Sequence, residues 1–113
     1  MTSGAQTVIF PVKDLDRAKT LFTALLGNPP TMDAPYYVQY NVAGQEVGLD
    51  PNGASKGLTG PVPYWHVDDI DATMAVLIEV GAEPKDAVTD FGGRRVGSVI
   101  DSDGNVIGLI QTA

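Results

Sequence analysis

The chain has 113 residues, a length that suits one globular domain with a single core. Its 43% hydrophobic content is that of an ordinary folded protein and excludes a disordered chain. Seven Lys and Arg residues stand against fourteen Asp and Glu, and this net charge of −7 argues against nucleic acid or an anionic membrane as a partner. No apolar stretch is long enough to span a membrane, and residues 1–6 lack the features of a signal peptide, so we expect a cytoplasmic protein.

The first half of the chain predicts one helix among several strands. Apolar alternation predicts a strand over residues 7–12, and a stripe with helical spacing follows it. Asp14 is placed to cap the start of that helix and Gly27 to end it. Strands are expected over residues 36–42 and 46–50, with a short one over 29–32. The predicted helical stripe consists of Leu15, Ala18, Leu21, Phe22, Leu25 and Leu26.

The second half repeats this order after a linker. Residues 49–63 are rich in proline and glycine and predict a loop. Strands are expected over residues 62–67, 94–100 and 105–111, with a short one over 85–89. The sequence DSDG at 101–104 predicts a hairpin turn in which Gly104 takes a positive φ. The helix is expected between a capping Asp69 and Gly81, with a stripe of Ile70, Met74, Leu77 and Val80.

Two short motifs recur at nearly the same spacing. The pattern V-x-D-[LI]-D occurs as VKDLD at residues 12–16 and as VDDID at 67–71, 55 residues later. A second pair, GQEVGL at 44–49 and GNVIGL at 104–109, follows in the same order. These ordered matches predict a duplicated module.

The sequence resembles the vicinal oxygen chelate superfamily of glyoxalases, bleomycin resistance proteins and dioxygenases. The resemblance rests on V-x-DLD-x-A-x-x-LF-x-x-x-LG at residues 12–27 and on the closing DSDGNVI at 101–107. It implies an α+β fold of two tandem βαβββ modules that form an open, cup-shaped mixed sheet with the helices outside, and it implies a homodimer. We expect one domain over residues 1–113, with module one at about 5–50, the linker at about 51–61 and module two at about 62–112.

In metal-dependent members of that superfamily, each module supplies metal ligands from its first and its last strand. Counted from the capping aspartates, the first-strand positions are Thr7 and Val62, and the last-strand positions are Gly48 and Gly108. Valine and glycine have no side-chain donor, and a threonine hydroxyl is a weak ligand. The chain also has no cysteine, so we expect neither a metal nor another cofactor. The paired glycines leave space that suits the close approach of a ligand or of another backbone.

Several polar and aromatic strand residues are candidates for ligand contact. Tyr37 and Gln39 alternate with Val38, so we expect them to face the cup. Tyr64 and His66 share that orientation on the first strand of module two. His66 is the only histidine; an ordinary hydrogen-bonded strand histidine is its most frequent role, followed by ligand contact or proton transfer and then by metal ligation.

Strand alternation and charge indicate the roles of Trp65 and of the two neighbouring arginines. Trp65 alternates with His66, which places it under a helix, in the core. Arg94 and Arg95 are the densest positive charge in the chain, and we consider Arg95 as a clamp for a carboxylate or phosphate of a ligand. Surface ion pairs are the more frequent role of such residues.

The absent metal ligands favour a metal-free binding protein, similar to the antibiotic-sequestering members of the superfamily, with an aromatic or planar small molecule in the cup or in a dimer cleft. The alternative is a lyase, isomerase or dioxygenase-like enzyme. That alternative requires a displaced metal site built from Glu46, Asp50 or His66, or metal-independent proton transfer through His66 or Glu46. A structural or partner-binding module with no small ligand also fits the sequence.

Overall fold

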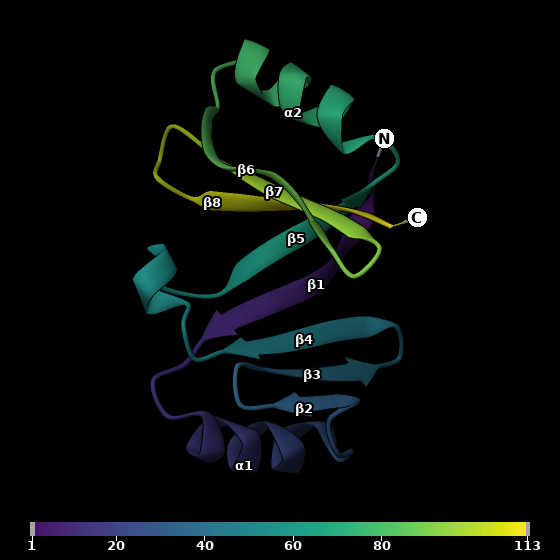
Figure 1. Ribbon diagram of the computed structural model, residues 1–113, viewed down its shortest axis with the longest axis vertical. Helices are drawn as coiled ribbons and strands as arrows, with labels where there is room; N and C mark the ends of the chain where they lie inside the picture. Colours follow the sequence, from purple (N-terminus) through teal and green to yellow (C-terminus); the bar gives the residue numbers. More distant parts are fainter. Residues whose placement is uncertain (1, 113) are drawn as a thin grey trace. The chain divides into compact units, whose positions relative to one another are not determined.

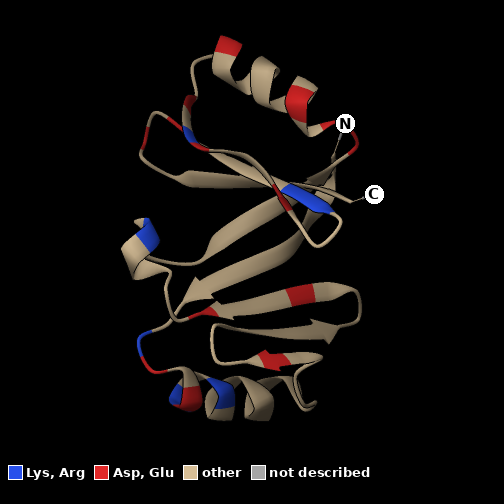
Figure 2. Cartoon of the chain, in the orientation of Figure 1, with Lys and Arg blue, Asp and Glu red and all other residues tan. Residues whose placement is uncertain are grey.

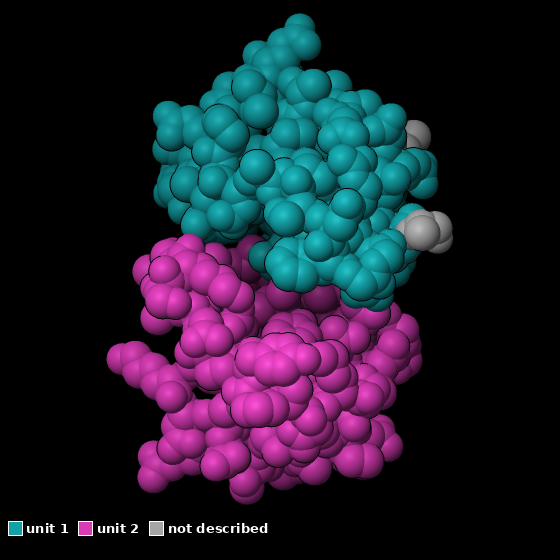
Figure 3. All heavy atoms as spheres, in the orientation of Figure 1, with its two compact units in different colours: residues 1–6, 63–113 teal, residues 7–62 magenta. Residues whose placement is uncertain are grey.

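The computed structural model describes residues 2–112, which group into two compact units. Unit 2 is Thr7–Val62, and unit 1 consists of the described part of residues 1–6 and of 63–113 (Figure 3). Strand β1 (Thr2–Pro11) therefore contributes its first residues to unit 1 and its remaining residues to unit 2. Within the described range, no helix is long and apolar enough to cross a membrane.

Unit 2 holds one mixed sheet and its helix. The strand order is β2-β3-β4-β1. Strand β1 runs parallel to β4, whereas β3 is antiparallel to both β2 and β4. The elements after β1 are α1 (Leu15–Leu26), β2 (Met32–Ala34), β3 (Tyr37–Val42), β4 (Gln45–Asp50) and the 3-10 helix η1 (Ala54–Lys56) (Figure 1).

The other four strands of the eight-stranded sheet repeat this topology. Their strand order is β5-β8-β7-β6, with β5 parallel to β8 and the other pairs antiparallel. Each half is thus a βαβββ module, which confirms the predicted α+β class, and β2 and β6 each have one neighbour, so the sheet is open. The elements are β5 (Val62–Val67), α2 (Ile70–Glu79), β6 (Glu83–Phe91), β7 (Arg94–Ile100) and β8 (Val106–Thr112) (Figure 1).

Both helices begin where the sequence predicts. Asp14 accepts a hydrogen bond from the backbone N–H of Arg17 at 3.1 Å, and Asp69 accepts one from Ala72 at 3.1 Å. These side chains satisfy N–H groups that the first turn of a helix leaves without an intrahelical partner. Gly27 ends α1 with φ of 74° and Gly104 turns the last hairpin with φ of 84°, both in the left-handed region that favours glycine.

Each helix packs its inner stripe against its own sheet. In unit 2 the buried core consists of Val38, Tyr40, Val47 and Leu49, covered by Leu15, Ala18, Phe22 and Leu26 of α1 and by Phe10 and Val12. In unit 1 it consists of Val67, Ile70 and Leu109, covered by Met74, Leu77 and Val88.

Four residues predicted for the core are exposed. Leu21 and Leu25 lie outside the α1 core, and Val80 lies outside the α2 core, because the predicted stripes were drawn wider than the face that meets the sheet. Trp65 is 38% exposed, so its predicted core role is wrong. Strand alternation gave the side of the sheet on which Trp65 lies, but it could not give how much of that side the helix covers.

Candidate functional site

In both modules, strand alternation separates the residues that meet the helix from those on the opposite face. Val38 of β3 packs against α1, which confirms the predicted alternation and places Tyr37 and Gln39 on the opposite face. On β5 the buried Val67 packs in the α2 core, so Tyr64 and His66 lie opposite it. We define the module-one face as Thr7, Tyr37, Gln39, Glu46 and Gly48, and the module-two face as Tyr64, His66 and Gly108.

On the module-one face, Tyr37 covers Gly48. These residues lie on paired antiparallel strands, in which Gln39 is the direct partner of Gly48 and Tyr37 its diagonal neighbour. A Cβ added to Gly48 would overlap the Tyr37 hydroxyl group and the end of its ring. The Tyr37 hydroxyl also donates to Gln39 Oε1 at 3.5 Å. The space that the missing side chain leaves is therefore occupied by a tyrosine.

The module-two face contains an equivalent arrangement. Tyr64 of β5 is the register partner of Gly108 on the parallel strand β8. A Cβ on Gly108 would lie 2.6 Å from both Cγ and Cε2 of the Tyr64 ring. Both last-strand glycines are thus covered by the ring of a tyrosine from a neighbouring strand. The sequence predicted open space at both glycines but contained no signal that a particular ring would fill it.

The two carboxylates near Gly48 are engaged in separate contacts. Thr7 Oγ1 donates to Glu46 Oε1 at 2.8 Å, because the two residues are partners on parallel strands. Asp50 is buried, and its carboxylate accepts from the Asn52 backbone N–H and from Lys56 Nζ, each at 2.8 Å. Asp50 therefore fixes the loop that carries η1.

His66 lies on the module-two face and is half-buried. Its backbone carbonyl accepts a hydrogen bond from Thr2 Oγ1 at 2.8 Å, within unit 1. Tyr64 precedes it by two residues and shares its side of β5. The structure therefore brings Tyr64, His66 and Gly108 to one face, as the sequence predicted.

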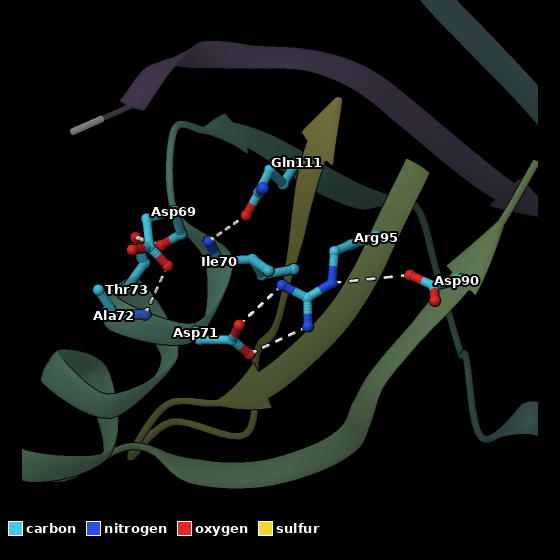
Figure 4. Close-up of polar contacts among 8 residues, drawn as sticks. All are labelled: Asp69, Ile70, Asp71, Ala72, Thr73, Asp90, Arg95 and Gln111. Carbon is cyan, nitrogen blue, oxygen red and sulfur yellow. Dashed lines mark hydrogen bonds and ion pairs between the residues drawn. The ribbon is translucent and has the colours of Figure 1, made fainter. Parts of the chain in front are cut away.

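Arg95 points to α2 rather than to the module-two face. Its guanidinium donates to Asp71 Oδ2 at 2.7 Å and to Oδ1 at 3.3 Å, and its Nε lies 3.6 Å from Asp90 Oδ1 (Figure 4). Gln111, its partner on β8, accepts from the Ile70 backbone N–H at 2.8 Å. These contacts fasten the start of α2 to β7 and β8, and they are the surface ion pairs that the sequence favoured for Arg95.

The Arg95–Asp71 ion pair makes stability depend on pH. The hydrogen bond from Arg95 lowers the pKa of Asp71 below its ordinary value of 3.8, and the charge of Arg95 lowers it further. Such a carboxyl contributes stability above the ordinary pKa, and the contribution is lost as the pH falls through the lowered pKa. We expect the Tm difference between the wild type and Asp71→Asn to be largest near neutral pH and to shrink under acid conditions, as measured by calorimetry. A difference that did not change with pH would contradict this.

The residues at the four superfamily positions do not fit a metal ion. Thr7 is buried and hydrogen-bonded to Glu46, Val62 has no donor atom, and the two glycines are covered by tyrosine rings. Within residues 2–112, His, Asp and Glu side chains form no group of three or more that could hold a metal ion. We derive no catalytic step through a metal.

The fold is shared with solved structures. A glyoxalase/bleomycin resistance protein/dioxygenase superfamily member from Vibrio splendidus 12B01 matches with a TM-score of 0.74 and 19% identity over 93% of this chain and 96% of its own. A variant of Streptomyces coelicolor methylmalonyl-CoA epimerase in complex with 2-nitronate-propionyl-CoA gives a TM-score of 0.73 and 14% sequence identity, over 100% of this chain and 99% of the epimerase chain. The Mn(II)-bound glyoxalase from Novosphingobium aromaticivorans gives a TM-score of 0.72 and 16% sequence identity. That match covers 98% of this chain and 40% of the glyoxalase chain.

These likenesses confirm at the level of fold the resemblance to the vicinal oxygen chelate superfamily that the motifs indicated. No family model matches the chain, and no curated protein matches its sequence. Because the identities are low, these likenesses show the fold and not the chemistry of this chain.

Proposed function

We propose that this chain is a cytoplasmic, metal-free small-molecule-binding protein that acts as a homodimer and holds an aromatic or planar ligand in the cup or in a dimer cleft, against the module-one or the module-two face. The observation that carries the proposal is the presence of glycines, which have no side-chain donor, at both last-strand positions, each covered by a tyrosine ring. A tyrosine offers a planar surface for stacking and a hydroxyl for hydrogen bonding, which suits a planar ligand.

The proposed contact residues are Tyr37 and Gln39 in module one and Tyr64 and His66 in module two. Gly48 and Gly108 support them, because only glycine lets the rings lie against the strand beneath. We leave Arg95 out of this set because its guanidinium pairs with Asp71 and Asp90.

The proposal is tested first by metal content and thermal shift. We expect untagged protein to contain no stoichiometric divalent metal by elemental mass spectrometry and to show no thermal shift with Mn²⁺, Ni²⁺ or Zn²⁺. A panel of planar aromatic compounds should raise Tm, since a ligand of the native state adds RT ln(1 + [L]/Kd). A CoA thioester, the ligand class named for the epimerase, belongs in the panel as an anionic comparison. Stoichiometric metal with a matching shift would overturn the proposal.

Variants then locate the ligand. Tyr37→Leu tests the module-one face and Tyr64→Leu tests the module-two face. The variant of the face that holds the best-binding compound is expected to weaken its affinity by tenfold or more, as measured by titration calorimetry. Tyr36→Leu is the matched control, because Tyr36 precedes Tyr37 and is 62% exposed. Equal affinities in all three variants would place the ligand elsewhere.

A further inference from the structure

The two helices expose apolar residues at equivalent positions of the repeat. Leu21 and Leu25 of α1 are 60% and 70% exposed. The equivalent residues 55 positions later are Val76 in α2 and Val80 at its C-terminal cap, and they are 57% and 76% exposed. In each pair the residues are four apart, so they lie side by side on adjacent turns. An exposed pair of this kind in both modules is more than the single scattered apolar residues of an ordinary surface.

The exposed stripes around these pairs differ in charge. In α1 the stripe is Arg17, Leu21, Ala24 and Leu25, and in α2 the equivalent residues are Ala72, Val76, Glu79 and Val80, all of them exposed. At 100° per residue, each set covers roughly 100° of the helix surface. Figure 2 shows α1 with basic and acidic residues, whereas α2 carries acidic residues alone.

We propose that the exposed stripe of α1 docks antiparallel on the exposed stripe of α2 of a second copy of this chain. The register that places Leu21 against Val76 of the other copy sets Leu25 against Ala72, so that a large residue meets a small one. The same register brings Arg17 opposite Val80, next to Glu79. The opposite charges of Arg17 and Glu79 meet at one end of this contact and favour α2 as the partner of α1.

Each copy carries one surface of each kind, so two copies can present an α1 stripe to an α2 stripe. The apolar pairs supply the buried centre, and Arg17 and Glu79 lie at its rim. This assignment concerns a surface remote from the tyrosine-covered faces, so it stands or fails independently of the proposed ligand binding.

Sedimentation velocity and light scattering on the full chain test the contact. We expect the wild type to exceed its 11.9 kDa monomer mass as concentration rises. Leu21→Gln and Val76→Gln should each raise the dissociation constant tenfold or more, because they place an amide in the apolar centre. Arg17→Glu and Glu79→Arg should each weaken association to a similar degree, and the double charge swap should restore it to within about threefold of the wild type.

The swaps are chosen so that loss of folding does not imitate loss of contact. Arg17→Glu places a glutamate three residues after the capping Asp14, which favours the helix start, and Glu79→Arg places a cation in the last turn. Lys13→Glu changes net charge equally outside the stripe and should leave association unchanged. A monomer at every concentration would overturn the proposal, as would association that survives the apolar variants or a double swap that fails to restore it.

Discussion

Replacing Gly108 by alanine is expected to lower the free energy of unfolding by about 1–3 kcal/mol, the usual cost of forcing an extra group into a packed site. The new Cβ would lie 2.6 Å from Tyr64 Cγ. That atom is next to the Tyr64 Cβ, so it moves away only if the Tyr64 χ1 angle changes to another rotamer or the β5 backbone shifts, and β5 is held by its pairing with β8. Chemical denaturation with a two-state fit measures the change.

Gly48→Ala is the matched comparison and should cost less. The atoms that its Cβ would meet are the hydroxyl and ring end of Tyr37, which a rotation of that side chain can withdraw. In a Tyr64→Leu background the cost of Gly108→Ala should fall, because the ring that causes the overlap is gone. A Gly108→Ala protein as stable as the wild type would show that the Tyr64 ring is not seated on the strand.

Tyr40→Ala is expected to cost about 3–5 kcal/mol, as for other large buried aromatic side chains. Tyr40 is fully buried in the core under α1. Its hydroxyl donates to the Lys19 carbonyl at 3.2 Å and hydrogen-bonds Thr23 Oγ1 at 2.8 Å, so it also ties β3 to the helix. Denaturation of the variant, followed by circular dichroism, gives the loss.

Tyr40→Phe separates packing from hydrogen bonding. It keeps the ring and removes the hydroxyl, so we expect a loss of about 0.5–1.5 kcal/mol. Thr23→Ala should then cost less in the Tyr40→Phe protein than in the wild type, because the shared hydrogen bond is already absent. If Tyr40→Phe cost as much as Tyr40→Ala, the hydroxyl contacts rather than the ring would dominate.

The fold could be predicted because its signals are local and occur twice. The capping aspartates, the glycine that ends α1 and the alternation along β3 each act within a few residues, and each is present in the structure. Strand β1 begins at Thr2, before its predicted start, because residues 2–6 are mostly polar or small and carry little strand signal. Strand β2 is displaced for a similar reason, since it has only three residues.

The sequence predicted which side of the strands the candidate site residues lie on, but it did not predict which residues their side chains contact. Alternation placed Tyr37 and Tyr64 correctly because side chains in a strand repeat every two residues. Which glycine each ring covers depends on the register between strands far apart in sequence, and one strand's sequence does not specify that register. The same limit hid the pairing of Arg95 with Asp71, which lies 24 residues away.

The tyrosine-covered glycines also constrain how this chain can evolve. A carboxylate introduced at position 108 would collide with the Tyr64 ring above it, and the loss of that ring alone would leave a void over a bare backbone. Each single change is expected to lower stability, so the two substitutions are coupled. In module two, a carboxylate at position 108 therefore requires two simultaneous changes, a barrier that selection on single mutations does not readily cross.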